Sequence, residues 1–276
     1  MNYLRALFFL LFNSLTTLVI AQRPLPISEV KPTVDLIQIE VDKLDLIYSL
    51  VDNSLHFLEN KGVFNVCNTE YVTRWDNDTS IFIYKNEEND VAYSIKYWKT
   101  TNLFSKPDTV IAEISNEEEG LIEKKQIAIE EAEQAKYHRE ISKTSQLAYL
   151  FYQSESGFTL YSLCLPKIDS IITFGNDMRF DFDLQMNLLS YQLIGRPLAA
   201  SIKKMDNPLG SELMSISAPV GIRDNDFKLL IPYFFKFKKF HQNIGLDVMS
   251  STINKRHLKY NAVENEISIK LFPNER

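Results

Sequence analysis

The chain has 276 residues, of which 45% are hydrophobic, 12% aromatic and 24% charged, and its formal net charge is −6. This composition is typical of a globular protein and excludes a collagen, a disordered tail and a multi-span membrane protein. It contains eight glycines, and the two closest, Gly210 and Gly221, stand 11 positions apart. The Walker loop, the Rossmann turn and the G-x-S-x-G elbow need closely spaced glycines, so all three are excluded. The negative charge argues against a nucleic-acid partner.

Residues 1–21 have the pattern of a cleavable signal peptide. Arg5 precedes a mostly apolar run over residues 6–20, and Ala21 occupies the small-residue position before a cut. Polar residues interrupt this run, which is shorter than the roughly 20 apolar residues that a membrane span needs. We therefore expect an exported protein, periplasmic or secreted, whose mature chain begins at Gln22 and has no integral membrane span.

Residues 22–34 contain three prolines and predict an extended linker. After it, a single domain is expected over residues 35–276, with a possible subdivision near 196–220. Apolar residues recur at alternating intervals of four and three from Ile37 to Leu58, so residues 35–60 predict a long amphipathic helix. Such heptads are compatible with a coiled coil, but further apolar residues widen the face and favour packing on a sheet or bundle.

Segments rich in β-branched and aromatic residues predict antiparallel hairpins, which pair 80–85 with 91–99, 146–153 with 158–165, and 178–183 with 187–194. Further strands are expected at 109–114 and 266–272. Because alternate residues of a strand share a face, Phe180 and Phe182 are expected in the core. The expected fold class is α+β, with antiparallel β-hairpins packed against two long helices.

The second of these helices is predicted over residues 117–143. One of its faces carries Leu121 and three alanines (Ala128, Ala132 and Ala135), which allow close packing. Beyond the hairpins, three prolines predict a loop region over 196–221. Pro232 is expected to interrupt any helix or central strand within the apolar stretch 227–240.

The two cysteines, Cys67 and Cys164, form a possible disulfide, which export would permit. Two separate buried thiols are the alternative. The four histidines form no H-E-x-x-H motif, and two cysteines at this separation form no C-x-x-C pair. We therefore expect no metal and no other cofactor.

Asp181 and Asp183 lie two positions apart in a predicted strand, so their carboxylates project from one face about 7 Å apart. This separation is near the range of glycosidase carboxylates. Arg179 shares that face, however, and alternating charges are typical of the solvated side of an antiparallel strand. A surface ion pair is therefore the favoured interpretation.

A basic stretch between Lys228 and Tyr260 contrasts with the acidic chain as a whole. It predicts a possible binding surface for an anionic ligand or an acidic envelope partner. The alternative is that these cations flank core residues and keep the surface soluble. The residues of this possible basic binding surface are Lys236, Lys238, Lys239, Lys255, Arg256 and Lys259.

The turn Phe174-Gly175-Asn176-Asp177, with the hairpin that follows it, resembles a segment of uncharacterised exported proteins from Bacteroidetes-type bacteria. The resemblance covers residues 128–193 and departs from that pattern at Leu184 and Met186. It implies an exported address and an α+β fold, and it implies no mechanism. The sequence as a whole predicts a non-enzymatic binding or interaction module of the bacterial envelope. The alternative is an envelope hydrolase that uses carboxylate or cysteine residues assembled by the fold.

Overall fold

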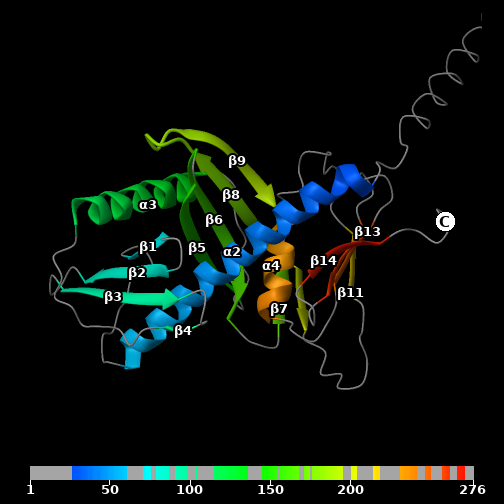
Figure 1. Ribbon diagram of the computed structural model, residues 1–276, viewed down its shortest axis with the longest axis horizontal. Helices are drawn as coiled ribbons and strands as arrows, with labels where there is room; N and C mark the ends of the chain where they lie inside the picture. The colour runs from blue at the N-terminus through cyan, green and yellow to red at the C-terminus, as the bar shows by residue number, and fades with distance from the viewer. Residues whose placement is uncertain are drawn as a thin grey trace, which may run out of the picture. The chain divides into compact units, whose positions relative to one another are not determined.

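The computed structural model (Figure 1) describes residues 27–60, 71–75, 79–86, 91–98, 103–104, 115–135, 145–154, 156–167, 171–174, 176–194, 200–203, 214–217, 231–240, 246–249, 257–261 and 266–270. The chain divides into two compact units. One contains Met1–Gln38, Leu209–Lys228 and Gln242–Arg276, and the other contains Ile39–Pro208 and Leu229–His241. The predicted single domain over 35–276 stays a prediction.

The long helix α2 spans Ile27–Asn60 and confirms the helix predicted over 35–60. It begins earlier than expected, so residues 27–34 are helical and not an extended linker. Pro32 lies within the helix, where its missing N–H costs one backbone hydrogen bond near the helix start. Buried side chains recur every three or four residues along one face, as an amphipathic helix requires. They are Val34, Ile37, Val41, Leu44, Ile47, Leu50 and Val51.

The central sheet consists of four antiparallel strands in the order β5-β6-β8-β9, and it confirms two of the predicted hairpins. The strands are β5 (Ser145–Ser154), β6 (Gly157–Pro166), β8 (Asp177–Phe182) and β9 (Leu188–Ile194). Gly157 opens β6 with a φ of 156°, and a Cβ at this position would lie 2.0 Å from the carbonyl oxygen of Phe182. The close approach of β6 to the end of β8 therefore requires glycine.

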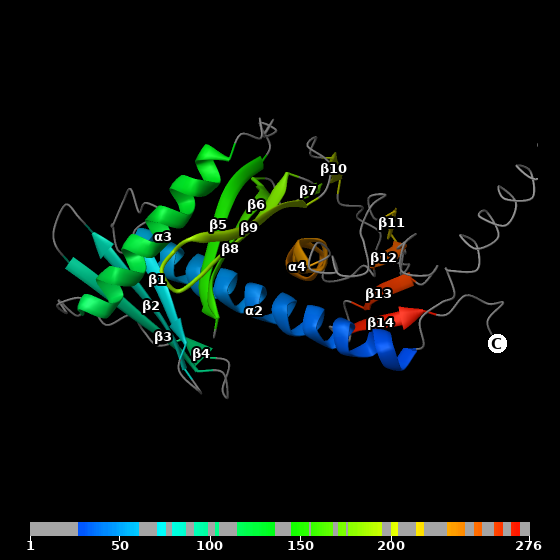
Figure 2. The ribbon, with the colours of Figure 1, turned by 90° about the horizontal axis from the view of Figure 1, so that it is seen from above.

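Helix α3 (Asn116–Gln134) covers one face of the central sheet, opposite the side on which α2 runs (Figure 2). A capping box fixes its start, because Ser115 accepts from the Glu118 N–H while the Glu118 side chain accepts from the Ser115 N–H. The helix ends at Gln134, short of the predicted end at 143. Beneath it lies a core cluster of Ala128, Ile129, Ala132, Phe151, Phe158, Leu160, Met178, Phe180 and Phe182.

A second four-stranded antiparallel sheet in the same unit has the order β1-β2-β3-β4 and confirms the first predicted hairpin as β2-β3. Its strands are β1 (Tyr71–Trp75), β2 (Thr79–Asn86), β3 (Val91–Trp98) and β4 (Leu103–Phe104). The buried Lys125 of α3 donates to the Tyr71 carbonyl, and the Tyr71 hydroxyl donates to the Tyr149 carbonyl of β5. These contacts join β1 to α3 and to one edge of the central sheet. The strand predicted at 109–114 lies outside the described residues.

Helix α4 (Ile231–Phe240) corrects the prediction that Pro232 interrupts any helix in this stretch. Pro232 is the second residue of the helix, where its N–H has no helical partner to lose, and its fixed φ suits a helix start. Phe235 of α4 packs edge-on against Tyr48 of α2, with ring centroids 5.8 Å apart. The two helices therefore pack against each other.

The same unit contains a two-stranded antiparallel sheet, which consists of β7 (Ile171–Phe174) and β10 (Ala200–Lys203). The other unit contains a sheet in the order β11-β12-β13-β14. Its strands are β11 (Met214–Ser217), β12 (Leu246–Met249), β13 (His257–Asn261) and β14 (Glu266–Lys270). Strands β10 and β11 correct the loop predicted over 196–221, and β14 confirms the last predicted strand. The α+β class is confirmed, and no helix within the described residues has the length and apolar character of a membrane span.

Candidate functional site

The candidate site lies on the second face of the central sheet, opposite the core cluster beneath α3. In the β6-β8 register, Thr159 pairs with Asp181 and Tyr161 with Arg179. These residues alternate with the phenylalanines of the core cluster, so they project from the other side. We call this side the polar face. Arg179 is 6% exposed, so the prediction of a solvated surface ion pair is wrong at this residue.

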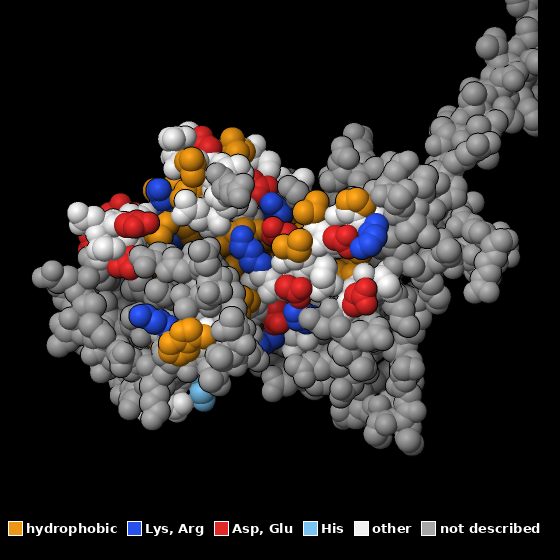
Figure 3. All heavy atoms as spheres, viewed as in Figure 1, with side chains coloured by type: hydrophobic (Ala, Val, Ile, Leu, Met, Phe, Trp, Pro, Cys, Tyr) orange, Lys and Arg blue, Asp and Glu red, His pale blue; other side chains and the backbone are white. Residues whose placement is uncertain are grey.

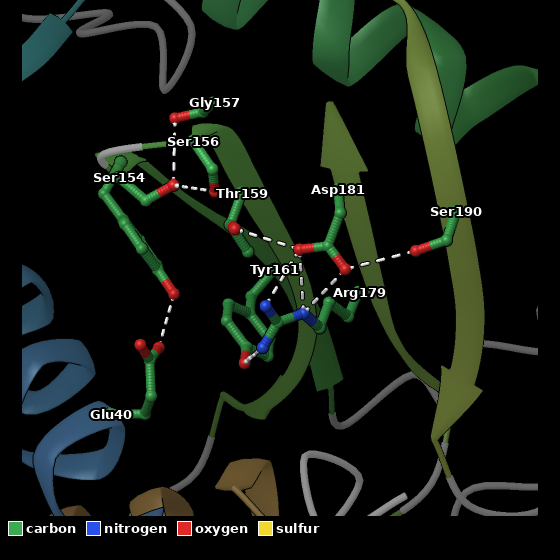
Figure 4. Close-up of polar contacts among 10 residues, drawn as sticks. Glu40, Ser154, Ser156, Gly157, Thr159, Tyr161, Arg179, Asp181 and Ser190 are labelled. Atoms are coloured by element: carbon green, nitrogen blue, oxygen red, sulfur yellow. Dashed lines mark hydrogen bonds and ion pairs between the residues drawn. The ribbon is translucent and has the colours of Figure 1, made fainter. Parts of the chain in front are cut away.

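Arg179 and Asp181 form a two-pronged ion pair at the centre of this face (Figure 4). The Arg179 Nε lies 3.0 and 3.1 Å from the two carboxylate oxygens of Asp181, and its Nη2 lies 2.8 Å from Oδ1. Thr159 donates to Oδ1 at 3.0 Å and Ser190 donates to Oδ2 at 3.2 Å. Both carboxylate oxygens of Asp181 therefore accept hydrogen bonds from side chains of the sheet itself.

Two tyrosines extend this network toward α2. Arg179 Nη1 donates to the Tyr161 hydroxyl at 2.6 Å, and the Tyr152 hydroxyl donates to the Glu40 carboxylate of α2. Burial raises the pKa of Tyr161 and of Tyr152 far above the usual range of a phenol. For Arg179, burial acts to lower the pKa, but Tyr161 and Asp181 outweigh it and leave the pKa raised. Because a general base works best with a pKa near the operating pH, these groups are poor candidates for proton transfer.

A second ion pair joins α4 to the start of β8 and is almost fully buried. Lys236 Nζ lies 2.7 and 2.8 Å from the two carboxylate oxygens of Asp177, and the side chains are 0% and 1% exposed. The Cys164 backbone N–H also donates to Asp177 Oδ1, at 2.8 Å. Burial, and after it the negative charge of Asp177, raises the pKa of Tyr233 to about 12.

Asp183 does not pair with Asp181 as a second carboxylate of one strand. It lies just past β8 and accepts from the Asn187 side chain, the Asn187 N–H and the Gln185 N–H at 2.8–2.9 Å. These hydrogen bonds, led by that of the Asn187 side chain, lower the pKa of Asp183. Its role in the structure is therefore to fix the turn between β8 and β9.

The possible basic binding surface is corrected at Lys236, whose side chain is buried in the ion pair with Asp177. Lys238 lies 2.5 Å from Asp42 and 3.3 Å from Asp45 of α2, and Lys239 donates to Ser49 at 3.0 Å. The cations of α4 thus bind groups of their own unit. The basic binding surface stays a prediction at its other three residues. The side chain of Lys259 is not described, and Lys255 and Arg256 lie outside the described residues.

The structure describes one of the two cysteines of the predicted disulfide. Cys164 is buried on β6, where its backbone N–H contacts Asp177. Cys67 lies outside the described residues, so the disulfide stays a prediction.

Several exposed apolar side chains belong to the β8-β9 hairpin, and small groups of apolar side chains are visible near the top of the view in Figure 3. Eight large hydrophobic residues are exposed among the side chains that the structure describes, and four of them belong to this hairpin. We call them the hairpin patch: Leu184, Leu188, Leu189 and Tyr191. Sequence reasoning found the hairpin but missed the patch. The available signal was that β9, unlike a solvated edge strand, contains no charged residue.

Within the described residues, no three His, Cys, Asp or Glu side chains are grouped so that they could hold a metal ion. A scan against protein-family models, a search of curated proteins and a search of solved structures each found no match. The functional argument therefore rests on the geometry of this chain.

Proposed function

We propose that the protein is an exported, non-enzymatic interaction module that docks an extended apolar segment of an envelope protein along β9. The hairpin patch is the observation that carries this proposal, because half of the exposed large hydrophobic residues among the side chains that the structure describes lie on one hairpin. Patches of this kind mark interaction sites on soluble proteins. In this proposal the hairpins form a platform that packs against the two long helices, as the sequence predicts.

The docking mode follows from the position of β9 in the sheet. Strand β9 is an edge strand, and its only paired neighbour within the described residues is β8. Its outer N–H and C=O groups suit an added strand of a partner, while Leu189 and Tyr191 supply exposed apolar side chains along the strand. A neutral, extended and apolar segment is the partner chemistry that matches this strand.

The hydrolase alternative has less support than the interaction module. Its carboxylate candidate, Asp181, is held by Arg179, Thr159 and Ser190, and the buried Asp177 is held by Lys236 and the Cys164 N–H. A nucleophile or general base needs a lone pair that is directed at a substrate. Both carboxylates direct their oxygens at donors of the protein instead.

The proposed partner is tested with two matched variants. Leu189→Asp places a charge in the hairpin patch, and Ile127→Asp places the same charge at an exposed apolar position of α3. We expect an envelope protein that co-purifies with the wild-type chain to be retained by Ile127→Asp and lost by Leu189→Asp. Equal retention by both variants would contradict docking along β9.

Export is tested separately, by sequencing the N-terminus of the protein recovered from the cell envelope or the medium. We expect it to begin at Gln22, because the signal peptide is removed after Ala21. Recovery of a chain that retains residues 1–21, in the fraction that stays inside the cell, would contradict export while leaving the docking proposal to its own test.

A further inference from the structure

The buried pair of Lys236 and Asp177 has a geometry that permits covalent chemistry. Lys236 Nζ lies 2.7 and 2.8 Å from the two oxygens of one carboxylate, and both side chains are excluded from water. The residues that precede Lys236 on α4, including Phe234 and Phe235, are also buried. An amine and a carboxyl group are therefore held in contact in a buried part of the protein.

Burial changes the balance between an ion pair and an amide. In water, an ammonium and a carboxylate are strongly solvated, and this solvation opposes condensation. In a dry interior the two charges lose that solvation, and its opposition to condensation is weaker. A fixed contact between the reacting groups replaces a bimolecular encounter, and this positioning lowers the barrier to reaction.

A backbone donor is placed where amide formation needs one. The Cys164 N–H donates to Asp177 Oδ1 at 2.8 Å. A preorganised donor at a carbonyl oxygen polarises the carbonyl and stabilises the charge that develops on this oxygen during attack by an amine. Oδ1 is therefore suited to remain as the carbonyl oxygen, and Oδ2 is suited to leave.

We propose that Lys236 and Asp177 are joined by an intramolecular isopeptide bond. A proton passes from Lys236 Nζ to Asp177 Oδ2, which gives a neutral amine and a carboxylic acid. After the carboxyl group turns about its Cβ–Cγ bond, Nζ attacks Cγ, the Cγ–Oδ2 bond breaks, and the departing hydroxyl takes one Nζ proton. The products are an amide and one water, and no oxidant or reductant is needed.

Helix α4 contains an internal comparison for this proposal. Lys238 contacts Asp42 at 2.5 Å, but the two side chains are 15% and 46% exposed. Solvent reaches this second pair and stabilises its charges, so we expect it to remain an ion pair. Burial, and not contact distance, distinguishes the two pairs.

Peptide mapping of the purified full chain tests the proposal. Trypsin cleaves after unmodified lysine and arginine, so an unlinked chain yields the free peptides 168–179 and 229–236. An amide on Lys236 blocks cleavage there. The linked chain should therefore yield one branched species, 168–179 joined to 229–238, with a mass lower than the sum of its parts by one water. Fragmentation of this species should place the branch at Asp177 and not at Asp169.

Two variants control this map. Lys236→Arg keeps a cation on α4 but has no amine that condenses with a carboxylate, so it should yield peptide 168–179 free. Lys238→Arg changes the exposed pair and should leave the linked species at its wild-type yield. Recovery of 168–179 and 229–236 as the main products from the wild-type chain would overturn the proposal, whatever the folding of the variants.

Discussion

The two faces of the central sheet are buried by different means. Beneath α3, apolar side chains such as Phe158 and Phe180 fill the space between the helix and the strands. On the polar face, the same strands carry Arg179, Asp181 and Asp177, whose charges are matched by partners from β6, β9 and α4. The first face depends on shape and volume, and the second on the completeness of its hydrogen bonds. This difference predicts how each face responds to substitution.

The largest expected effect follows the loss of one partner of the buried ion pair. Lys236→Met removes the amine that either the ion pair or the proposed amide requires and leaves the Asp177 carboxylate buried without a partner, so we expect the free energy of unfolding to fall by about 3–5 kcal/mol. Adding Asp177→Asn removes the stranded charge and keeps an acceptor for the Cys164 N–H, so the double variant should regain much of the loss. Denaturant unfolding of the two single variants and the double variant measures the coupling. Strictly additive losses would contradict the pairing.

A smaller loss is expected at the other ion pair of the polar face. Arg179→Met removes the charged donor of Asp181 but leaves Thr159 and Ser190 in place, so we expect a loss of about 2 kcal/mol. Arg179→Lys keeps the charge but cannot form the two-pronged contact, and its stability should be intermediate. Unfolding curves at matched salt rank the stabilities of the wild type, Arg179→Lys and Arg179→Met. A purely steric role of Arg179 would not place Arg179→Lys between the other two.

On the face beneath α3, removal of a single methylene group should lower stability at a buried position and have little effect at an exposed one. Ile129→Val shortens a side chain of the core cluster and should cost about 1 kcal/mol. Ile127→Val makes the same change at a residue of α3 that is 44% exposed, and it should have little effect on stability. Equal losses in thermal unfolding would show that α3 does not pack on the sheet as described.

The smallest expected effect concerns Asp183, in the exposed turn between β8 and β9, and it depends on pH. The pKa of Asp183 is lowered in the folded state, so its contribution to stability is present above the pKa of the unfolded chain, near 4. It is lost as the pH falls through the lowered folded value. Between about pH 6 and pH 3, the wild-type chain should therefore lose more stability than Asp183→Ala. Parallel pH profiles of the two proteins would contradict this role.

The periodic parts of the sequence predicted the structure best. Hairpins β2-β3, β5-β6 and β8-β9 are predicted because runs with strand periodicity are separated by short connections, and the buried positions of Phe180 and Phe182 follow from the same alternation. Helix α4 was missed because Pro232 was interpreted as an interruption and not as a helix start. The Ser115 capping box is a local signal for the beginning of α3, one residue before the predicted start of that helix at residue 117.

The site was less predictable than the fold, since it depends on contacts between distant segments. The sequence indicates that Arg179 and Asp181 form a pair, but nothing local indicates that Arg179 is buried and not solvated. Lys236 resembles its neighbours Lys238 and Lys239 in sequence, yet it alone of the three is fully buried, against an aspartate 59 positions earlier. Such long-range pairs leave no periodic signal.

The proposal that β9 docks a partner segment is tested most directly by photo-crosslinking in intact cells. A photoreactive phenylalanine analogue is placed at position 189 in one variant and at position 127 of α3 in the other, two exposed apolar sites of the same unit. We predict a discrete adduct with one envelope protein from position 189 and none from position 127. The absence of an adduct at position 189, or the same adduct from both positions, would contradict docking along β9.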